Sequence, residues 1–371
     1  MKFAIISHTP HGFSDGNFFA YAPYVREMNL WNQYADEVTV VAPLNLSRPT
    51  DIHLRYSHPN INVQSIPAMD LLSWRSVCQS LWQTPRTCLR IYKAMKKADH
   101  IHLRCPGNIG LLGCLVQILF PKKKKTAKYA GNWDPKAPQP KSYKLQRWIL
   151  NNTFLTKNMK VLVYGEWPHC SENILPFFTA TYRETDKIEV EARPLIDKIN
   201  FLFVGSLAVG KRPLYAVKLI EKLSDSGHEV QLALYGDGEE RSNLEQYIAE
   251  KKLPNVVIMG NQTEAVVRKA YQSAHFLLLP SKSEGWPKVV AEAMFWRCFP
   301  IATAVSCVPF MLDQENRGML LQMNLEADVN AIDALLNSPE AYAKKVSDAM
   351  NWSRNYTLDL FEDRIKNLLA I

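Results

Sequence analysis

The feature that most constrains the fold is a regular alternation of short apolar strands with helical stretches in the second half of the chain. From residue 199 onwards, β-branched and apolar segments alternate with segments of helical periodicity. The predicted strands cover Ile199–Gly205, Val230–Tyr235, Val256–Met259, His275–Pro280 and Phe299–Thr303, and the predicted helices cover Pro213–Leu223, Glu239–Lys251, Thr263–Ser273 and Pro287–Phe295. This alternation predicts a parallel sheet with right-handed crossovers.

A looser version of the same pattern occupies the first half. Its predicted strands are Lys2–Ser7, Glu37–Ala42, His100–Arg104 and Lys125–Ala130, and Ser76–Lys97 has helical periodicity. The chain has 371 residues, more than the roughly 250–300 at which a single core stops growing. We therefore predict an α/β chain of two doubly wound, Rossmann-like domains facing each other across a cleft, with residues 1–190 and 191–371 as the domains. The last helix either stays with the second domain or packs back on the first.

The positive charge is confined to the first half. Residues 1–190 carry 24 Lys and Arg against 13 Asp and Glu, a net charge of +11, whereas residues 191–371 carry 20 against 23, a net charge of −3. Cations are combined with aromatic residues in Lys122–Lys125 with Lys128, and in the stretch from Leu71 to Lys97, which includes Trp74 and Trp82. This pattern is typical of a protein on an anionic membrane surface, and a merely solvated basic face is the alternative. No nucleic acid partner is expected, because no known binding module accompanies the charge.

Other features indicate a cytoplasmic protein, either free or peripheral on the inner face of the membrane. The longest apolar stretch, Ile109–Phe120, is shorter than the ~18 residues of a membrane span, and Met1–Pro10 is too short for a secretory signal. The seven cysteines are odd in number and never form a Cys-x-x-Cys pair, so reduced thiols are expected. No Asp-x-Asp triplet and no metal-binding His pair occurs, and no metal site is predicted.

The most informative turn follows the predicted strand His275–Pro280 and reads SKSEGWPKVVAEAM from Ser281 to Met294. Ligands of open α/β sheets lie at the carboxyl ends of the strands. The free N–H groups at the start of the next helix suit a phosphate, with Pro287 at the first helical position. Glu284 and Glu292 are suited to bind the hydroxyls of a sugar and a ribose. The alternative interpretation is an acid that satisfies the helix dipole and an exposed helical glutamate.

Ser281–Met294 and Cys298–Thr303, together with Phe203–Lys211 and Tyr235–Gly238, resemble the signature of retaining GT-B glycosyltransferases of the family-4 type, also called group 1 glycosyltransferases. The hallmark of that family is two glutamates separated by seven residues, and the resemblance covers roughly residues 199–325. It implies metal-independent transfer of a hexose-type sugar, with retention, from a UDP- or GDP-linked donor to a glycan or lipid-linked glycan acceptor in surface polysaccharide biosynthesis. The nucleotide sugar is then a substrate, and no further cofactor is expected.

The resemblance also implies roles for single residues. Glu284 would lie against the donor sugar, Glu292 would bind the ribose, and Lys211 would neutralise the leaving diphosphate. The catalytic set is then Lys211, Glu284, Asp134 and Arg104, and the donor-binding set is Glu292, Arg212, Ser206, Gly205, Gly285, Trp286, Pro287, Gly236 and Gly12. Arg104 ends one predicted strand of the first half and Asp134 follows another, and the first half supplies the acceptor side in this architecture. For the neighbouring His102 we expect a place in the core, and a role in the site is the alternative.

Three positions depart from the family pattern. Ser206 stands where the family has an Arg on the donor pyrophosphate, and Thr303–Phe310 lacks the usual glycines and acid. Arg297 replaces the usual Gly at a helix end, where a left-handed conformation costs about 1 kcal/mol or more. These departures motivate an alternative from another class, a GT-B protein that binds a sugar nucleotide or glycan without turnover.

Overall fold

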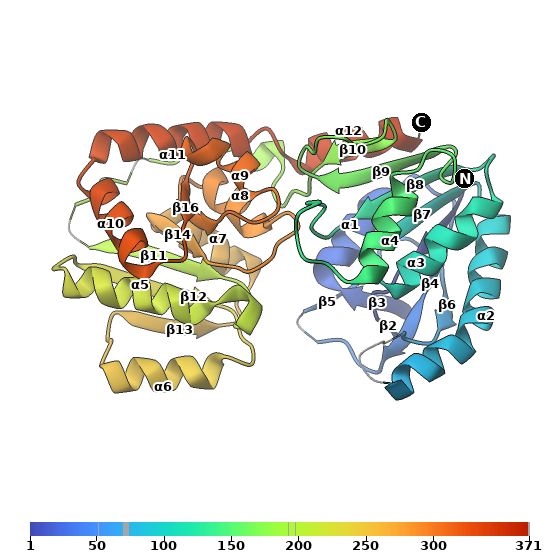
Figure 1. The fold of residues 1–371 in the computed structure, drawn as a ribbon, viewed down its shortest axis with the longest axis horizontal. Helices are drawn as coiled ribbons and strands as arrows, with labels where there is room; N and C mark the ends of the chain where they lie inside the picture. Colours follow the sequence, from blue (N-terminus) through green and yellow to red (C-terminus); the bar gives the residue numbers. More distant parts are fainter. Residues whose placement is uncertain (51, 70–73, 192, 197, 370–371) are drawn as a thin grey trace. The chain divides into compact units, whose positions relative to one another are not determined.

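The computed structural model describes residues 1–371 except 51, 70–73, 192, 197 and 370–371, and it describes the backbone alone for residues 74–81 (Figure 1). The chain forms two compact units. Unit 1 contains Met1–Phe177 and Glu362–Ile371, and unit 2 contains Phe178–Phe361. The units divide at Phe177/Phe178, whereas the sequence analysis set the division at residue 190. The end of the last helix, α12 (Leu358–Leu369), belongs to unit 1.

Unit 1 contains a parallel sheet in the order β6-β4-β1-β7-β8-β9-β10. Its strands are β1 (Lys2–Ile6), β4 (Glu37–Leu46), β6 (Ile61–Ile66), β7 (His100–Cys105), β8 (Lys124–Tyr129), β9 (Met159–Tyr164) and β10 (Ile174–Phe177). Its helices are α1 (Ala22–Asn32), α2 (Trp74–Lys97), α3 (Asn108–Val116) with the short η1 (Gln117–Leu119), and α4 (Lys141–Leu150). The strand order reverses between β1 and β7, which makes that point the topological switch of the unit.

Side chains of the unit 1 strands alternate between two covered faces. On one face, Leu103 of β7 packs with Ile91 of α2 and Leu112 of α3. On the other face, the His102 ring packs against Trp31 of α1, with ring centroids 4.6 Å apart and the ring planes inclined at 41°. His102 is fully buried and shares Thr126 Oγ1 with His100, so the core interpretation of His102 is confirmed. Buried strands of this kind read as short apolar runs with a few internally paired polar residues.

The predicted basic tract is partly internal. Lys125 and Lys128 lie in β8 and are buried, at 2% and 0% exposure. The Lys125 ammonium donates to the carbonyls of Gln117 and Phe120, and burial lowers its pKa to about 8. Lys123 donates to the backbone at the end of α2. The prediction that all of these lysines form an outer basic face is therefore wrong. Lys125 and Lys128 lie in a strand that is covered on both faces, and Lys123 is bound to the end of α2. Residues 71–73 of the other predicted stretch lie outside the described residues, as does the side chain of Trp74.

An antiparallel extension of unit 1 has no counterpart in the sequence analysis. It contains β2 (His11–Ser14), β3 (Asn17–Tyr21) and β5 (His53–Arg55), and β2 also pairs with the end of β4. The hairpin turn is Asp15-Gly16, with φ of 51° and 75°, which matches the two-residue turn that Asp-Gly favours. Gly12, predicted in a glycine-rich loop, lies instead in β2.

Unit 2 contains a fully parallel sheet in the order β13-β12-β11-β14-β15-β16. Its strands are β11 (Ile199–Val204), β12 (Val230–Tyr235), β13 (Val256–Gly260), β14 (Phe276–Leu279), β15 (Phe299–Thr303) and β16 (Met319–Leu321). Its helices are α5 (Pro213–Asp225), α6 (Arg241–Lys251), α7 (Glu264–Ser273), α8 (Lys288–Phe295), α9 (Val308–Met311), α10 (Leu325–Leu336), α11 (Pro339–Ser353) and the start of α12. The predicted series of strands and helices is confirmed, with ends shifted by one or two residues. The α/β prediction of two Rossmann-like sheets holds for both units.

Two helix ends of unit 2 bear on the signature segment. Pro287 is the N-cap of α8, which begins one residue later than predicted, at Lys288. Arg297, after the end of α8, has φ of 60°, the left-handed conformation expected for this position. Its guanidinium donates to the Val190 carbonyl at 2.8 Å. Of the helices in the described part of the chain, none has the length and apolar character that crossing a bilayer requires.

Candidate functional site

The strand order of unit 2 reverses between β11 and β14, and most of the predicted donor residues lie in the loops that follow these two strands. The loop after β11 runs from Gly205 to Arg212, and the loop after β14 runs from Pro280 to Pro287. Parallel strands end at one edge of the sheet, so both loops lie at the place where open α/β sheets bind ligands. We call the second loop the signature loop.

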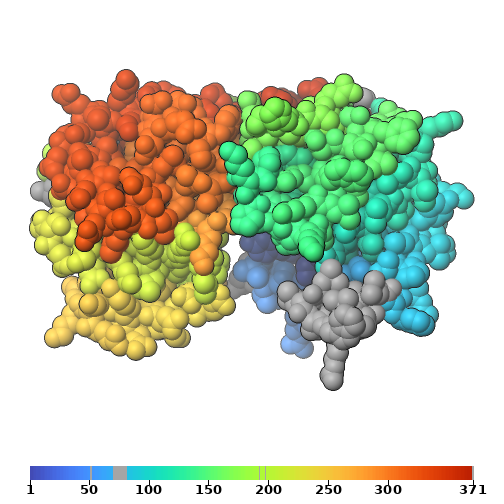
Figure 2. All heavy atoms as spheres, in the orientation of Figure 1, coloured from blue at the N-terminus to red at the C-terminus, as the bar shows by residue number. Residues whose placement is uncertain are grey.

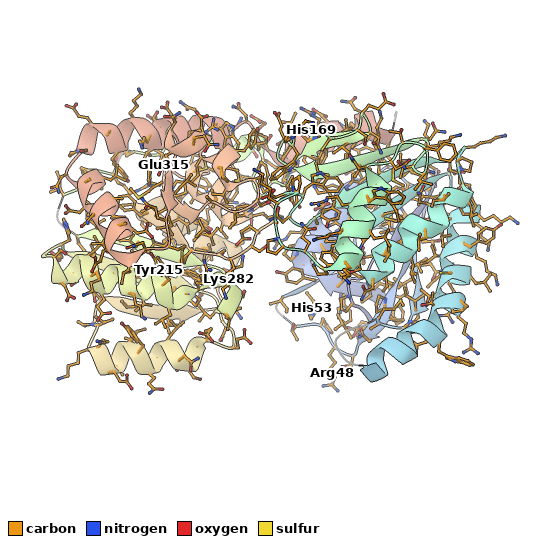
Figure 3. All side chains as sticks on the ribbon, in the orientation of Figure 1. Arg48, His53, His169, Tyr215, Lys282 and Glu315 are labelled. Carbon is orange, nitrogen blue, oxygen red and sulfur yellow. The ribbon has the colours of Figure 1, made fainter. Side chains whose placement is uncertain are left out.

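An ion pair joins the two loops. Lys211 Nζ lies 2.5 Å from Glu284 Oε1, and the side chains are 29% and 9% exposed. The backbone N–H of Lys282 also donates to the Gly210 carbonyl at 2.8 Å. Lys282 itself is exposed, and Figure 3 labels it on the ribbon of this loop. Two of the predicted catalytic residues thus lie together, with the cation within reach of solvent.

Glycines allow the loops after β11 and β12 to approach closely. Gly236 has φ of 143°, and a Cβ at this position would lie 1.9 Å from the Gly205 carbonyl oxygen. The Leu207 N–H donates to the Asp237 carbonyl at 3.0 Å. Any side chain at Gly236 would therefore push the loop after β11 away, which gives this glycine a physical role without a ligand.

The loop after β15 holds the signature loop from the other side. Thr303 Oγ1 donates to the Ser281 carbonyl at 2.6 Å. Ser306 Oγ and Cys307 Sγ both donate to the Gly285 carbonyl at 3.0 Å. Burial raises the pKa of the Cys307 thiol to about 12, so it stays a neutral donor. These side chains occupy the segment that lacks the family's glycines, and their position directly after a predicted strand was the available sequence signal.

Glu292 has a separate set of contacts. Thr181 donates to its Oε1 at 2.6 Å, and the Tyr271 hydroxyl donates to its Oε2 at 3.2 Å. Burial raises the pKa of this carboxyl group. A pocket of unit 2 is lined here by Thr181, Tyr182, Lys288, Glu292, Ser353 and Tyr356. The carboxylate does accept from two hydroxyls at once, but in this structure both belong to the protein.

The remaining predicted donor residues lie around the same loops. Ser206 is exposed, and Arg212 adopts a left-handed conformation, with φ of 52°, as the N-cap of α5. Trp286 is 6% exposed and packs in an aromatic cluster with Trp352 and Tyr356, at ring distances of 6.2 and 5.5 Å. The cluster anchors the signature loop on the helices behind it.

In unit 1, Arg104 ends β7 beside the switch point of that sheet. Its guanidinium forms an ion pair with Glu27 of α1, and both side chains are nearly buried, at 10% and 8% exposure. The guanidinium carbon also lies 5.4 Å from the centre of the Tyr24 ring. The charge of Arg104 is thus neutralised within the unit.

The other two predicted residues of unit 1 lie in different surroundings. Asp134 is half-buried in the loop after β8, and its Oδ1 accepts from the Lys136 N–H at 2.8 Å. Gly12 is buried against the Phe19 ring, where a Cβ would lie 2.2 Å from the ring. Among the residues that the structure describes, no three His, Cys, Asp or Glu side chains gather as metal ligands.

The two Rossmann-like units, with a charged pair at the switch point of the second, define a GT-B fold, which the chain shares with solved structures. Sucrose-phosphate synthase of Thermosynechococcus elongatus aligns over 100% of this chain and 98% of its own, with a TM-score of 0.67 and 17% identity. Anabaena HepE, solved in complex with UDP and glucose, aligns over 100% and 99%, with a TM-score of 0.68 and 12% identity.

The second half of the chain also matches a family model. Residues 186–352 match the model of glycosyl transferases group 1. An uncharacterized glycosyltransferase of Haemophilus influenzae is 29% identical over 178 residues, which cover 47% of this chain and 50% of that protein. The match thus spans about half the length of this curated relative.

Proposed function

We propose that the protein is a retaining glycosyltransferase that moves a hexose-type sugar from a UDP- or GDP-linked donor to a glycan or lipid-linked glycan during surface polysaccharide biosynthesis. The observation that carries the proposal is the Lys211–Glu284 pair at the switch point of unit 2, inside the segment that matches the family. The bound UDP and glucose of HepE support a nucleotide-sugar donor for a chain of this fold.

The proposed chemistry uses the electrostatics of this pair. When a sugar leaves a nucleotide diphosphate, negative charge grows on the departing diphosphate, and a cation fixed beside it lowers the barrier. Lys211 is held by Glu284 and remains 29% exposed, so it can exchange this partner for phosphate oxygens. Glu284 would then be released to accept from the hydroxyls of the donor sugar. Arg212, the next residue, is the further cation that would compensate for Ser206.

In this proposal unit 1 binds the acceptor and Asp134 orients its hydroxyl. Arg104, which is enclosed with Glu27, supports the fold at the switch point of unit 1 rather than binding an anionic group of the substrate. The reaction needs no metal, because Lys211 supplies the positive charge. The protein would work in the cytoplasm beside the inner membrane face, where lipid-linked acceptors are assembled.

The test is a donor panel with the purified protein. UDP-glucose, UDP-galactose, UDP-N-acetylglucosamine and GDP-mannose are supplied separately, and released UDP or GDP is measured with and without EDTA. Release from one donor, unchanged by EDTA and with retained anomeric configuration in the product, is the expected result. Nucleotide binding without release from any donor would instead favour a binding protein without turnover, as Ser206 suggests. Loss of release in EDTA with recovery on added Mn²⁺ would contradict the metal-free mechanism.

A further inference from the structure

The outer side of the helices α2, α3 and α4 in unit 1 is a continuous layer. Helix α3 packs beside both α2 and α4. Their inner sides share one hydrophobic core, to which Ile91, Leu112 and Ile149 contribute from the three helices. Their other sides therefore face outward together, and Figures 1 and 2 show α2 (cyan) and the segment around α4 (green) on the surface of unit 1. We call this outer side the α2–α4 surface.

Large apolar side chains protrude from the α2–α4 surface. The most exposed are Trp82 at 77%, Phe154 at 75%, Leu119 at 65%, Trp148 at 60%, Leu89 at 52%, Leu115 at 44% and Leu145 at 43%. Single exposed apolar residues are ordinary, whereas several on adjoining helices and the segments that follow them mark an interaction surface. Other residues of these helices, such as Ile91, Leu112 and Ile149, fill the hydrophobic core of unit 1.

The charge around these residues has one sign. Residues 71–165 contain 18 Lys and Arg but only 2 Asp and Glu, and 12 of the 18 remain when Arg104 and the tract 122–128 are left out. Exposed cations alternate with the apolar side chains: Arg86 and Lys93 on α2, and Lys141 and Lys144 on α4. Lys157 Nζ lies 5.1 Å from the centre of the Phe154 ring, which brings a cation beside the most exposed aromatic residue of the segment after α4. These are different residues from the tract 122–128, part of which is internal.

We propose that the α2–α4 surface docks on the headgroup region of a bilayer that contains anionic lipids. The cations complement the negative leaflet, and Trp148, Phe154 and Trp82 suit the boundary between headgroups and acyl chains. A nucleic acid would be attracted by the same cations and could stack on the aromatic rings. It would gain nothing from Leu89, Leu119 and Leu145, and these aliphatic side chains favour the bilayer. The inference rests on the place beside the membrane given in the proposed function and deepens it by naming the surface that makes the contact. Sugar transfer itself is tested separately, by nucleotide release without lipid.

The experiment is co-sedimentation of the full-length protein with vesicles of phosphatidylcholine containing 0, 15 or 30 mol% phosphatidylglycerol, at 50 and 500 mM salt. Binding should rise steeply with the anionic fraction and weaken in salt, because exposed charges are screened. The triple variant Lys141→Gln, Lys144→Gln and Lys157→Gln should weaken binding at 50 mM salt by about a hundredfold, from the usual contribution of each basic residue near a leaflet. The double variant Trp148→Ala and Phe154→Ala should weaken binding at both salt concentrations.

Matched controls lie in unit 2. Lys222, Lys251 and Lys344 are exposed, and their triple change to Gln removes the same charge. Ile188 and Ile196 are 53% and 65% exposed, and their change to Ala removes apolar surface elsewhere. Both controls should bind vesicles as the wild type does. Absence of binding to 30 mol% anionic vesicles at 50 mM salt would overturn the proposal. A loss of vesicle binding in the control variants equal to that in the unit 1 variants would also overturn it. So would binding to an RNA homopolymer that is stronger than binding to the vesicles and does not change in Trp148→Ala. Nucleotide release measured without lipid reports separately on the transferase.

Discussion

Both units have the same strand order around their switch points, yet the ion pairs placed there differ in their access to solvent. In unit 2 the pair is Lys211–Glu284, with the cation 29% exposed. In unit 1 the pair is Arg104–Glu27, with both side chains at 10% or less. A charge that is fully enclosed by its partner serves the fold, whereas one that keeps solvent access can change partners. The comparison indicates that a charged group at a switch point does not by itself form a ligand-binding site, because the group must also be exposed to solvent.

The difference between the two ion pairs is tested most strongly by removing the cation from each pair. Arg104→Leu leaves the Glu27 carboxylate buried beside an apolar side chain, and the free energy of unfolding should fall by about 3–5 kcal/mol. Lys211→Met should change it by about 1 kcal/mol or less, since the cation is partly solvated. Urea denaturation of the two variants measures both effects. The double variant Arg104→Leu with Glu27→Leu should recover part of the loss, and an Arg104→Leu protein as stable as Lys211→Met would contradict the assignment of the unit 1 pair to the fold.

Acid should weaken unit 1 through its buried histidines. Burial lowers the pKa of His11 and of His100 to about 4. Above pH 6.5 these groups are neutral in both the folded and the unfolded chain, so they contribute no pH dependence. Between pH 6.5 and about 4 only the unfolded chain binds the protons, and each histidine should cost about 2 kcal/mol of stability at pH 5.

Pulse-labelled hydrogen exchange, with samples equilibrated in urea at pH 7 or pH 5 and labelled at one pH, measures this effect separately for the two units. The urea midpoint of unit 1 should drop at pH 5, and the drop should shrink in His11→Gln. A midpoint for unit 1 that does not change between pH 7 and pH 5 would show that these histidines are charged in the folded protein.

Nucleotide affinity tests whether Glu292, the second glutamate of the signature segment, binds the ribose. If Glu292 binds the ribose, Glu292→Ala loses a charged acceptor, and the affinity for UDP or GDP should fall by about 1.5–3 kcal/mol in calorimetry. Tyr271→Phe removes only an internal donor to the same carboxylate and is the matched control, with affinity close to wild type. Unchanged affinity in Glu292→Ala, with a lower free energy of unfolding, would assign Glu292 to holding Thr181 and Tyr271 instead.

The smallest expected effect concerns the support of the signature loop. Ser306→Ala removes one donor to the Gly285 carbonyl, a hydrogen bond worth about 1 kcal/mol, while Cys307 keeps the other. We expect kcat to fall about fivefold or less with little change in donor KM, since the loop position is loosened rather than lost. Ser306 has φ of 51°, so Ser306→Gly, which loses the hydroxyl without backbone strain, serves as the control and should lose about as much as Ser306→Ala. A wild-type kcat in Ser306→Gly would mean that the hydroxyl does not position the loop.

Much of unit 2 could be predicted from the sequence because its strands are buried on both faces and read as short apolar runs such as Phe276–Leu279. The fold of unit 1 is harder to predict from the sequence, for a physical reason. In β8, the Lys125 ammonium is satisfied by the carbonyls of Gln117 and Phe120, and that of Lys128 lies over the rings of Tyr164 and Phe177. No periodic pattern marks these contacts, so the lysine-rich run is typical of a solvated surface. Glu27, the partner of Arg104, lies 77 positions away in the sequence, and no local pattern predicts this pairing. The β2–β3 hairpin did carry a local signal, Asp15-Gly16, which we did not use.

Some residues of the candidate site could likewise be predicted from the sequence, and others could not. Glu284 and Lys211 could be placed because they belong to loops whose positions follow from strand order. The surroundings of Glu292 could not, since Thr181 lies in the segment before the first strand of unit 2 and reaches α8 only through the tertiary fold. The support from Ser306 and Cys307 was likewise hidden, because the family pattern directed attention to the glycines that are missing.

The measurement that tests the central claim most directly is the steady-state rate of nucleotide release by Lys211→Ala beside the wild type. If Lys211 faces the leaving diphosphate, kcat should fall by about 10²–10³-fold while the donor KM changes only a few-fold, because the charge grows in the transition state. Lys222→Ala, an exposed lysine on the adjoining helix α5, should release nucleotide at the wild-type rate. A kcat for Lys211→Ala equal to that of the wild type would contradict the account and remove the switch point of unit 2 from the chemistry.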